Sequence, residues 1–232
     1  RFFQHERKHL FSDIKYAAVN KDYIKDGLLP KIGSEFERKI MEKLISKTKK
    51  NIGNFIDKPD DDDKVYFRNT GAVYYCMAFD KPPYYSVNGL PKISSTLSEI
   101  KIKKEFKSCL LSLFHSSLFY WYWTVYSDCY HFTKNDLVRL PVDIEELCKS
   151  KCNFDELYEE ISASLNEHKA LVRYKKSFGD LEYHEFRHRN SKRVFDKVDK
   201  VLAKYYLLDD EELEFIINYD IKYRVGDEGN QE

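Results

Sequence analysis

The chain has 232 residues, of which 39 are Lys or Arg and 39 are Asp or Glu, so its formal net charge is zero. With 42% hydrophobic residues, 8 Gly and 6 Pro, the composition is that of a globular protein and excludes disordered and collagen-like chains. The first 150 residues carry 25 basic and 20 acidic side chains, and the rest carry 14 and 19. A polyanion would therefore be attracted to the first part, or to local basic faces.

The aromatic residues and the cysteines say more about the class of protein and the kinds of site it can contain. The 18 Tyr and 16 Phe could fill a core or contact nucleic-acid bases, and composition does not choose between these uses. The cysteine count is odd and lacks the paired spacing of a zinc site or a disulfide framework, which predicts reduced thiols in a cytoplasmic protein without a metal. No apolar stretch approaches the roughly 20 residues that cross a bilayer, so no membrane partner is expected. The cysteines are Cys76, Cys109, Cys129, Cys148 and Cys152.

Residues 1–63 are predicted to form an N-terminal helical and linker segment. Ser34 is a good N-cap, and Phe36, Ile40 and Leu44 follow it at helical spacing, so a helix is expected from there to about Lys50. The acidic run 57–63 is interpreted as an exposed loop, because its like charges repel and its proline interrupts regular structure.

Residues 64–104 have the composition of short strands and turns, rich in Val, Tyr and Phe. Asn88-Gly89 is the strongest hairpin signal, because both residues tolerate the positive φ of a tight turn. The tetrad 81–84, Lys-Pro-Pro-Tyr, is similar to the Asn/Asp-Pro-Pro-Tyr/Phe catalytic loop of amino-methylating DNA methyltransferases. Lysine lacks the hydrogen-bond acceptor that this chemistry needs, so we interpret the tetrad as a turn between strands.

Residues 105–126 show apolar side chains every three or four positions, which predicts one long buried helix. Its aromatic cluster, 121–123 with Tyr126, could be a stacking platform for bases, but its helical spacing with Leu118 favours a core. His115 on the same helix is interpreted as a buried histidine with a hydrogen-bond partner.

The rest of the chain is predicted to be helical. Thr133 can cap a short helix through Asp136. We expect further helices within 144–171, from about 191 to 206, and from about Asp209 through Tyr219, with a break at 177–180. The fold class is therefore α+β: a small mixed β-sheet packed on a long buried helix, between helical N-terminal and C-terminal segments. The segments are 1–63, a recognition core 64–142, a helical part 143–226 and a frayed tail 227–232.

Several common catalytic motifs do not occur in this sequence. It contains no Gly-x-Gly-x-x-Gly, phosphate-loop, Gly-x-Ser-x-Gly or His-Glu-x-x-His pattern. No nucleotide or S-adenosylmethionine site is therefore expected in this chain, and no catalytic or cofactor-binding residue is assigned.

Six stretches resemble a known family. They are LFHSSLFYWYW (113–123), SDCYHFTKND (127–136) leading to LPV (140–142), SKRVFDKVDKVLA (191–203), EELEFIINYDIKYR (211–224), PKIGS (30–34) and YFRNTG (66–71). Together they look like the target-recognition regions that follow the catalytic domain in adenine-N6 DNA methyltransferases of type II, chiefly type IIG, restriction–modification systems.

The resemblance implies a DNA-reading module that works with the catalytic methyltransferase domain of the same parent chain. That domain would bind S-adenosylmethionine, and a nuclease domain precedes it in some members. Because this chain lacks the cofactor and Asn-Pro-Pro-Tyr motifs, only recognition can be carried over, with double-stranded DNA as the partner and no catalysis by this chain alone.

Three groups of residues are candidates for contacting DNA, since base edges need polar partners and phosphates need Lys, Arg or hydroxyl groups. The second group surrounds a predicted helix start and the third is the densest basic patch, and each has an ordinary alternative as a cap or a solvated surface. The first group is Arg68, Asn69, Thr70, Lys81, Tyr84, Tyr85, Asn88, Lys92, Ser94, Ser95 and Thr96; the second is His131, Thr133, Lys134 and Asn135; the third is Lys175, Lys176, Arg187, Arg189 and Lys192.

Two other functions remain open at this point. The acidic, helical last third could dock a nuclease or a partner subunit of a phage-defence system. An independent methyltransferase would need a cofactor site that the sequence does not show.

Overall fold

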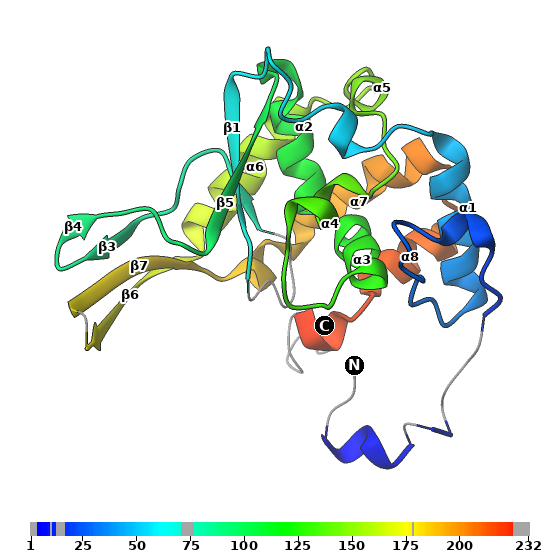
Figure 1. The fold of residues 1–232 in the computed structure, drawn as a ribbon, viewed down its shortest axis with the longest axis horizontal. Coiled ribbons are helices and arrows are strands. Elements are labelled where there is room, and N and C mark those ends of the chain that lie inside the picture. The colour runs from blue at the N-terminus through cyan, green and yellow to red at the C-terminus, as the bar shows by residue number, and fades with distance from the viewer. Residues whose placement is uncertain (1–3, 10, 13–16, 71–76, 178, 225–232) are drawn as a thin grey trace.

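The computed structural model describes residues 4–9, 11–12, 17–70, 77–177 and 179–224. Within them the chain forms a helical body, from which a sheet extends to one side as an arm (Figure 1). The predicted α+β class is confirmed. The predicted frayed tail 227–232, together with Gly71 and Cys76, lies outside the described residues.

Helices make up most of the body. Three of their predicted starts are confirmed, because the side chains of Ser34, Thr133 and Asp209 each accept a hydrogen bond from a backbone N–H in the first turn. The α-helices are α1 (Glu35–Lys47), α2 (Lys104–Phe114), α3 (Ser117–Tyr126), α4 (Lys134–Val138), α5 (Ile144–Cys148), α6 (Phe154–Glu167), α7 (Lys192–Tyr206), α8 (Asp210–Asn218) and α9 (Ile221–Arg224). The 3-10 helices are η1 (Gln4–His9), η2 (Lys21–Tyr23), η3 (Ile52–Asn54) and η4 (His188–Ser191).

The expectation of one unbroken helix over 105–126 is wrong, because the chain bends at His115 and Ser116. Ser116 has an extended backbone, and its hydroxyl accepts a hydrogen bond from the N–H of Phe119 at 3.0 Å. The buried carboxylate of Asp199 accepts the N–H groups of Ser117 and Leu118, each at 3.0 Å. Because these acceptors satisfy the backbone donors that a new helix start leaves free, the break is stable inside the core.

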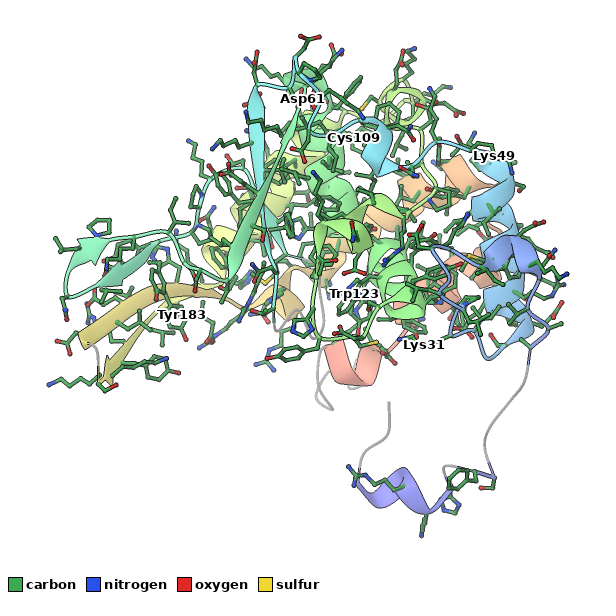
Figure 2. The ribbon with its side chains drawn as sticks, viewed as in Figure 1. Lys31, Lys49, Asp61, Cys109, Trp123 and Tyr183 are labelled. Carbon is green, nitrogen blue, oxygen red and sulfur yellow. The ribbon has the colours of Figure 1, made fainter. Side chains whose placement is uncertain are left out.

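Helix α3 forms the centre of the core. Every side chain from Ser117 to Tyr126 is buried, which confirms that the aromatic cluster is core rather than an exposed stacking platform. The indole of Trp121 still donates a hydrogen bond to Glu37 at 3.2 Å, and that of Trp123 donates to the carbonyl of His131 at 3.2 Å. Figure 2 shows Trp123 enclosed by the helices of the body.

His115 is buried beside the bend, as predicted. Its exposed fraction is 1%, and its Nε2 lies 3.0 Å from the carbonyl of Ala78. The ring stacks on Phe195 with a centroid distance of 5.2 Å. Burial lowers the pKa of His115 to about 4, so the ring is neutral at physiological pH.

The strands form two antiparallel sheets, not the single mixed sheet expected from residues 64–104. The first sheet has the order β2 (Ala78–Phe79), β1 (Asp63–Arg68) and β5 (Leu97–Ile102), and it packs against α2. The second sheet, which we call the arm, has the order β4 (Leu90–Pro91), β3 (Tyr85–Val87), β7 (Gly179–Phe186) and β6 (Lys169–Lys176).

The arm corrects the expectation that residues 143–226 are entirely helical. Strands β6 and β7 form a hairpin, and β7 also pairs with β3 from almost a hundred residues earlier. The break predicted at 177–180 is the region of this hairpin turn. The predicted Asn88-Gly89 turn is confirmed, with φ of 53° and 75° and Val87 paired to Leu90. Residues 81–84 connect β2 to β3, as predicted for the Lys-Pro-Pro-Tyr tetrad.

Candidate nucleic-acid interface

A groove of about 480 Å³ separates the first sheet from the base of the arm. We call it the inter-sheet groove. Apolar side chains that are mostly buried form its floor, and exposed or half-buried polar side chains stand around it. The floor residues include Met77, Phe79 and Leu181, with exposed fractions of 6, 8 and 5%. The polar residues include Arg68, Ser95, Thr96, Tyr85, Tyr183 and Lys176.

Strand register brings these residues together from two distant parts of the chain. Arg68 ends β1 opposite Leu97, which places the loop 94–96 beside it. In the arm, Tyr85 of β3 lies directly opposite Tyr183 of β7, and residues paired in this way share one face of a sheet. Figure 2 shows Tyr183 on the arm, well away from Trp123 in the body.

Arg68 is held at the edge of the groove without a carboxylate partner among the described residues. Its Nε donates a hydrogen bond to the carbonyl of Thr70 at 2.9 Å. A backbone carbonyl orients the guanidinium and leaves its full charge available to an anion. Arg187 and Arg189, which follow β7, are likewise exposed and form no ion pair within the described part of the chain.

The first predicted group is divided by the structure. Arg68, Tyr84, Tyr85, Ser94, Ser95 and Thr96 line the groove. Lys81 and Lys92 are exposed elsewhere. The side chain of Asn69 donates to the hydroxyl of Ser98 at 2.9 Å, and that of Asn88 accepts the N–H of Asp180 at 2.8 Å. These two amides therefore serve local structure.

The second predicted group lies next to the end of β1. A β-bridge joins Thr70 to His131, and the N–H of Phe132 donates to Asn69 at 3.0 Å. His131 contacts Asp128 through Nδ1 at 2.5 Å. Partial burial opposes ionisation of Asp128, but hydrogen bonds from His131 and from backbone N–H groups lower its pKa to about 2.

The predicted phosphate contact at Thr133 and Lys134 meets competition from acidic side chains of the chain itself. Asp136 accepts hydrogen bonds from the N–H and the hydroxyl of Thr133, at 2.8 and 2.7 Å. Lys134 forms an ion pair with Asp57. Asn135 is exposed beside them. Both cationic and N–H donors are thus already engaged, which favours the capping role of this group.

The third predicted group divides too. Lys175 and Lys176 are exposed on β6, and Lys176 lines the groove. Lys192 pairs with Asp196, and its side chain is only 14% exposed. Burial lowers the pKa of Lys192 although Asp196 acts in the opposite direction. Lys192 is therefore part of the packed start of α7 rather than a free surface cation.

Sequence reasoning missed the β7 side of the groove, which includes Tyr183, His184, Phe186 and His188. Burial lowers the pKa of His188 to about 4, and the positive charge of Arg68 acts in the same direction. The signal was present as an alternation of Leu181 and Tyr183 with polar neighbours, which is typical of a strand.

Comparison with known proteins adds no relative: no family model, no curated protein and no solved structure matches this chain. Among the described residues, no three His, Cys, Asp or Glu side chains are grouped so that they could hold a metal ion. The described cysteines, Cys109, Cys129, Cys148 and Cys152, are free thiols. None of the helices in the described part of the chain is long and apolar enough to cross a membrane.

Proposed function

We propose that this chain reads double-stranded DNA for an adenine-N6 DNA methyltransferase of a restriction–modification system. The methyl transfer from S-adenosylmethionine would be carried out by a catalytic domain of the parent enzyme. No role in catalysis is assigned to this chain. The cytoplasm is the expected location, because the substrate of the parent enzyme would be bacterial DNA.

The inter-sheet groove is the observation that carries the proposal. It brings together Arg68 with the hydroxyls of 94–96 and Lys176 with the tyrosines of the arm. Arg68 and Lys176 belong to two predicted groups that are far apart in the sequence. DNA recognition needs this combination, because cations hold the phosphates while hydroxyl, phenol and guanidinium groups can reach base edges.

The shape of the arm also supports DNA binding. Its strands extend beyond the helical body (Figure 1), and the major groove of B-DNA admits a two-stranded β-ribbon. Lys169, Arg173, Lys175 and Lys176 are interspersed with Leu171 and Tyr174 along β6, and all six side chains are exposed. Arg173 forms an ion pair with Glu182 at 2.8 Å, so DNA would have to compete with that carboxylate for the guanidinium. A ribbon with this composition could contact phosphates and bases together.

Binding to random duplex pools, measured by gel shift over a salt series, tests the proposal. We expect binding at about 50 mM salt that weakens steeply as salt rises, because released counterions supply much of the affinity. The Arg68→Ala/Lys176→Ala variant should bind about tenfold more weakly, with a slope of log affinity against log salt reduced by about 1 to 2.

The Lys200→Ala/Lys204→Ala variant is the matched control. Both lysines are exposed on α7, neither lines the groove, and removing them changes the net charge by the same amount. Equal losses in the two variants would indicate nonspecific attraction and contradict the proposed interface. Absence of binding by the wild-type chain at about 50 mM salt would contradict DNA recognition altogether.

One observation favours the alternative function, a docking module for a nuclease or partner subunit. Phe36 of α1 is 40% exposed and stacks on Phe215 of α8 at a centroid distance of 6.1 Å. Glu211, Glu214 and Asp220 surround these rings. A partner with an apolar side chain among basic residues would fit this surface, and the duplex experiment separates the two functions.

A further inference from the structure

We propose that the inter-sheet groove holds one unstacked nucleotide of the bound DNA, with the base over the apolar floor and the phosphate on Arg68 and Lys176. This inference rests on the proposed function and specifies what the groove recognises. It assigns to one site a base-sized ligand rather than the continuous surface of a duplex.

The floor of the groove is the first reason. Met77, Phe79 and Leu181 offer a ligand mainly apolar atoms. An intact duplex presents phosphates, sugars, polar base edges and, in the major groove, thymine methyl groups, and its flat base surfaces are covered by stacking. Only an unstacked base exposes an aromatic face that gains by leaving water for such a floor.

The size of the groove agrees with this ligand. A volume of about 480 Å³ lies within the range of roughly 300 to 1,000 Å³ found for small-molecule sites. The site is also concave, so a convex duplex could cover its opening but could not fill it. A base with its sugar could enter while the neighbouring nucleotides remain outside.

Tyrosine rings of the arm line the groove. Tyr85 and Tyr183 are a directly opposed pair on one face of the arm, and both are only partly buried. Tyr183 also stacks on Tyr174 at a centroid distance of 6.1 Å and an interplanar angle of 28°, which fixes the ring in place. Base–aromatic stacking contributes to binding with little dependence on the base.

Charge completes the site. Arg68 and Tyr183 line the same groove, together with Glu185. Burial raises the pKa of the Tyr183 phenol, as does the negative charge of Glu185, while the positive charge of Arg68 lowers it. An anion on Arg68 would therefore lie beside the tyrosine rings, as the phosphate and base of one nucleotide do. The hydroxyls of Ser94, Ser95 and Thr96 line the same groove and could accept or donate hydrogen bonds to the base or sugar.

Duplexes that carry one unpaired nucleotide test the inference. The unpaired position is moved stepwise through a bound duplex sequence, and the affinity of each duplex is compared with that of the fully paired one. We expect one position at which binding is about tenfold to a hundredfold tighter, because unpairing a base in advance removes a cost of a few kcal/mol.

Variants of the groove connect this preference to the proposed residues. Tyr183→Ala should abolish the preference for the unpaired nucleotide, while Tyr183→Phe should keep it because the ring remains. Arg68→Ala should weaken binding of paired and unpaired duplexes by a similar factor, because it removes a phosphate contact. Leu171→Ala, on the exposed strand β6 outside the groove, is the control and should change neither.

Each outcome has a separate meaning. Duplex binding with equal affinity at every unpaired position overturns the inference and leaves the proposed function standing. The inference is also overturned if Tyr183→Ala still prefers the duplex with the unpaired nucleotide, while Tyr183→Phe and Leu171→Ala fold normally. If free deoxynucleoside monophosphates bind in a Tyr183-dependent manner and no duplex does, the groove is a site for free nucleotides, and both the DNA inference and the proposed function are wrong.

Discussion

The helical body and the arm use aromatic residues in opposite ways. In the body, α3 buries every one of its rings, and the phenols of Tyr122 and Tyr126 donate to backbone carbonyls. In the arm, Tyr174 is 50% exposed, and no side chain of β6 is buried. The rings of the body thus pack in the core and stabilise the fold, and rings of the arm remain accessible to a ligand. The high aromatic content of the sequence therefore serves both purposes, in separate regions.

Removing one ring from each region should give the largest contrast. Trp121→Ala is expected to lower the free energy of unfolding by about 3 to 5 kcal/mol, because it leaves a large cavity in the core and removes the hydrogen bond to Glu37. Tyr174→Ala should cost less than about 1 kcal/mol, since half of that side chain is already in water. Urea denaturation followed by circular dichroism measures both values. A similar loss in the two variants would contradict the division of roles.

The acid stability of the body should depend on its buried histidine. The pKa of His115 is about 4 in the folded chain, against about 6.5 in the unfolded chain. Between these pH values the unfolded chain binds a proton that the folded chain does not bind. The contribution of His115 to stability is therefore full above about pH 6.5 and falls by about 3 kcal/mol as pH drops toward 4. Burial lowers the pKa of His188 to about 4 as well, so His188 adds to the loss of stability in the same pH range.

His115→Gln tests this pH dependence, since the amide can still donate a hydrogen bond to Ala78 but does not titrate. The variant should lose less stability than the wild type between pH 6.5 and 4, as measured by urea denaturation at each pH. Asp199 acts in the opposite direction, because burial raises its pKa from 3.8 and its contribution to stability falls as pH rises above that value. The difference between variant and wild type isolates His115. Parallel pH profiles would show that His115 is not the source.

The same contrast explains what the sequence could predict. Local patterns identified Ser34 and Thr133 as caps, a helix start near Asp209 and Asn88-Gly89 as a turn, because each depends on neighbouring residues. They also predicted that α3 is buried, but not the bend at Ser116. That bend depends on the carboxylate of Asp199, about eighty residues away.

The candidate site was only partly predictable for the same reason. Several polar residues of 68–96 and Lys176, which were predicted as DNA contacts in two separate groups, line one groove, and their contact with DNA stays a prediction. The hairpin of β6 and β7 was missed for two reasons. Leu171 and Val172 of β6 continue the apolar spacing of α6, and the pairing of β7 with β3 is nonlocal. Nor does the sequence reveal that Lys134 pairs with Asp57. The pair of Lys192 with Asp196 has the i,i+4 spacing of helical neighbours and could have been predicted.

A substitution at the tip of the arm should give a smaller and more local effect than the loss of Trp121 or the protonation of His115. Gly179 has a φ of 129°, and a Cβ there would lie 2.2 Å from Oδ1 of Asn88. In Gly179→Ala the Asn88 side chain must move and give up its hydrogen bond from Asp180. We expect a loss of about 1 to 2 kcal/mol in the arm, seen as faster hydrogen exchange of β3, β6 and β7 with the α3 amides unchanged.

Gly27→Ala is the matched control, because Gly27 has a φ of 78° with nothing within 4 Å of the added Cβ and lies outside the arm. It should leave exchange in the arm unaltered. Faster exchange of α3 in Gly179→Ala would mean that the arm and the body unfold as one unit, and the comparison between them would then describe surface exposure only, without a difference in local stability.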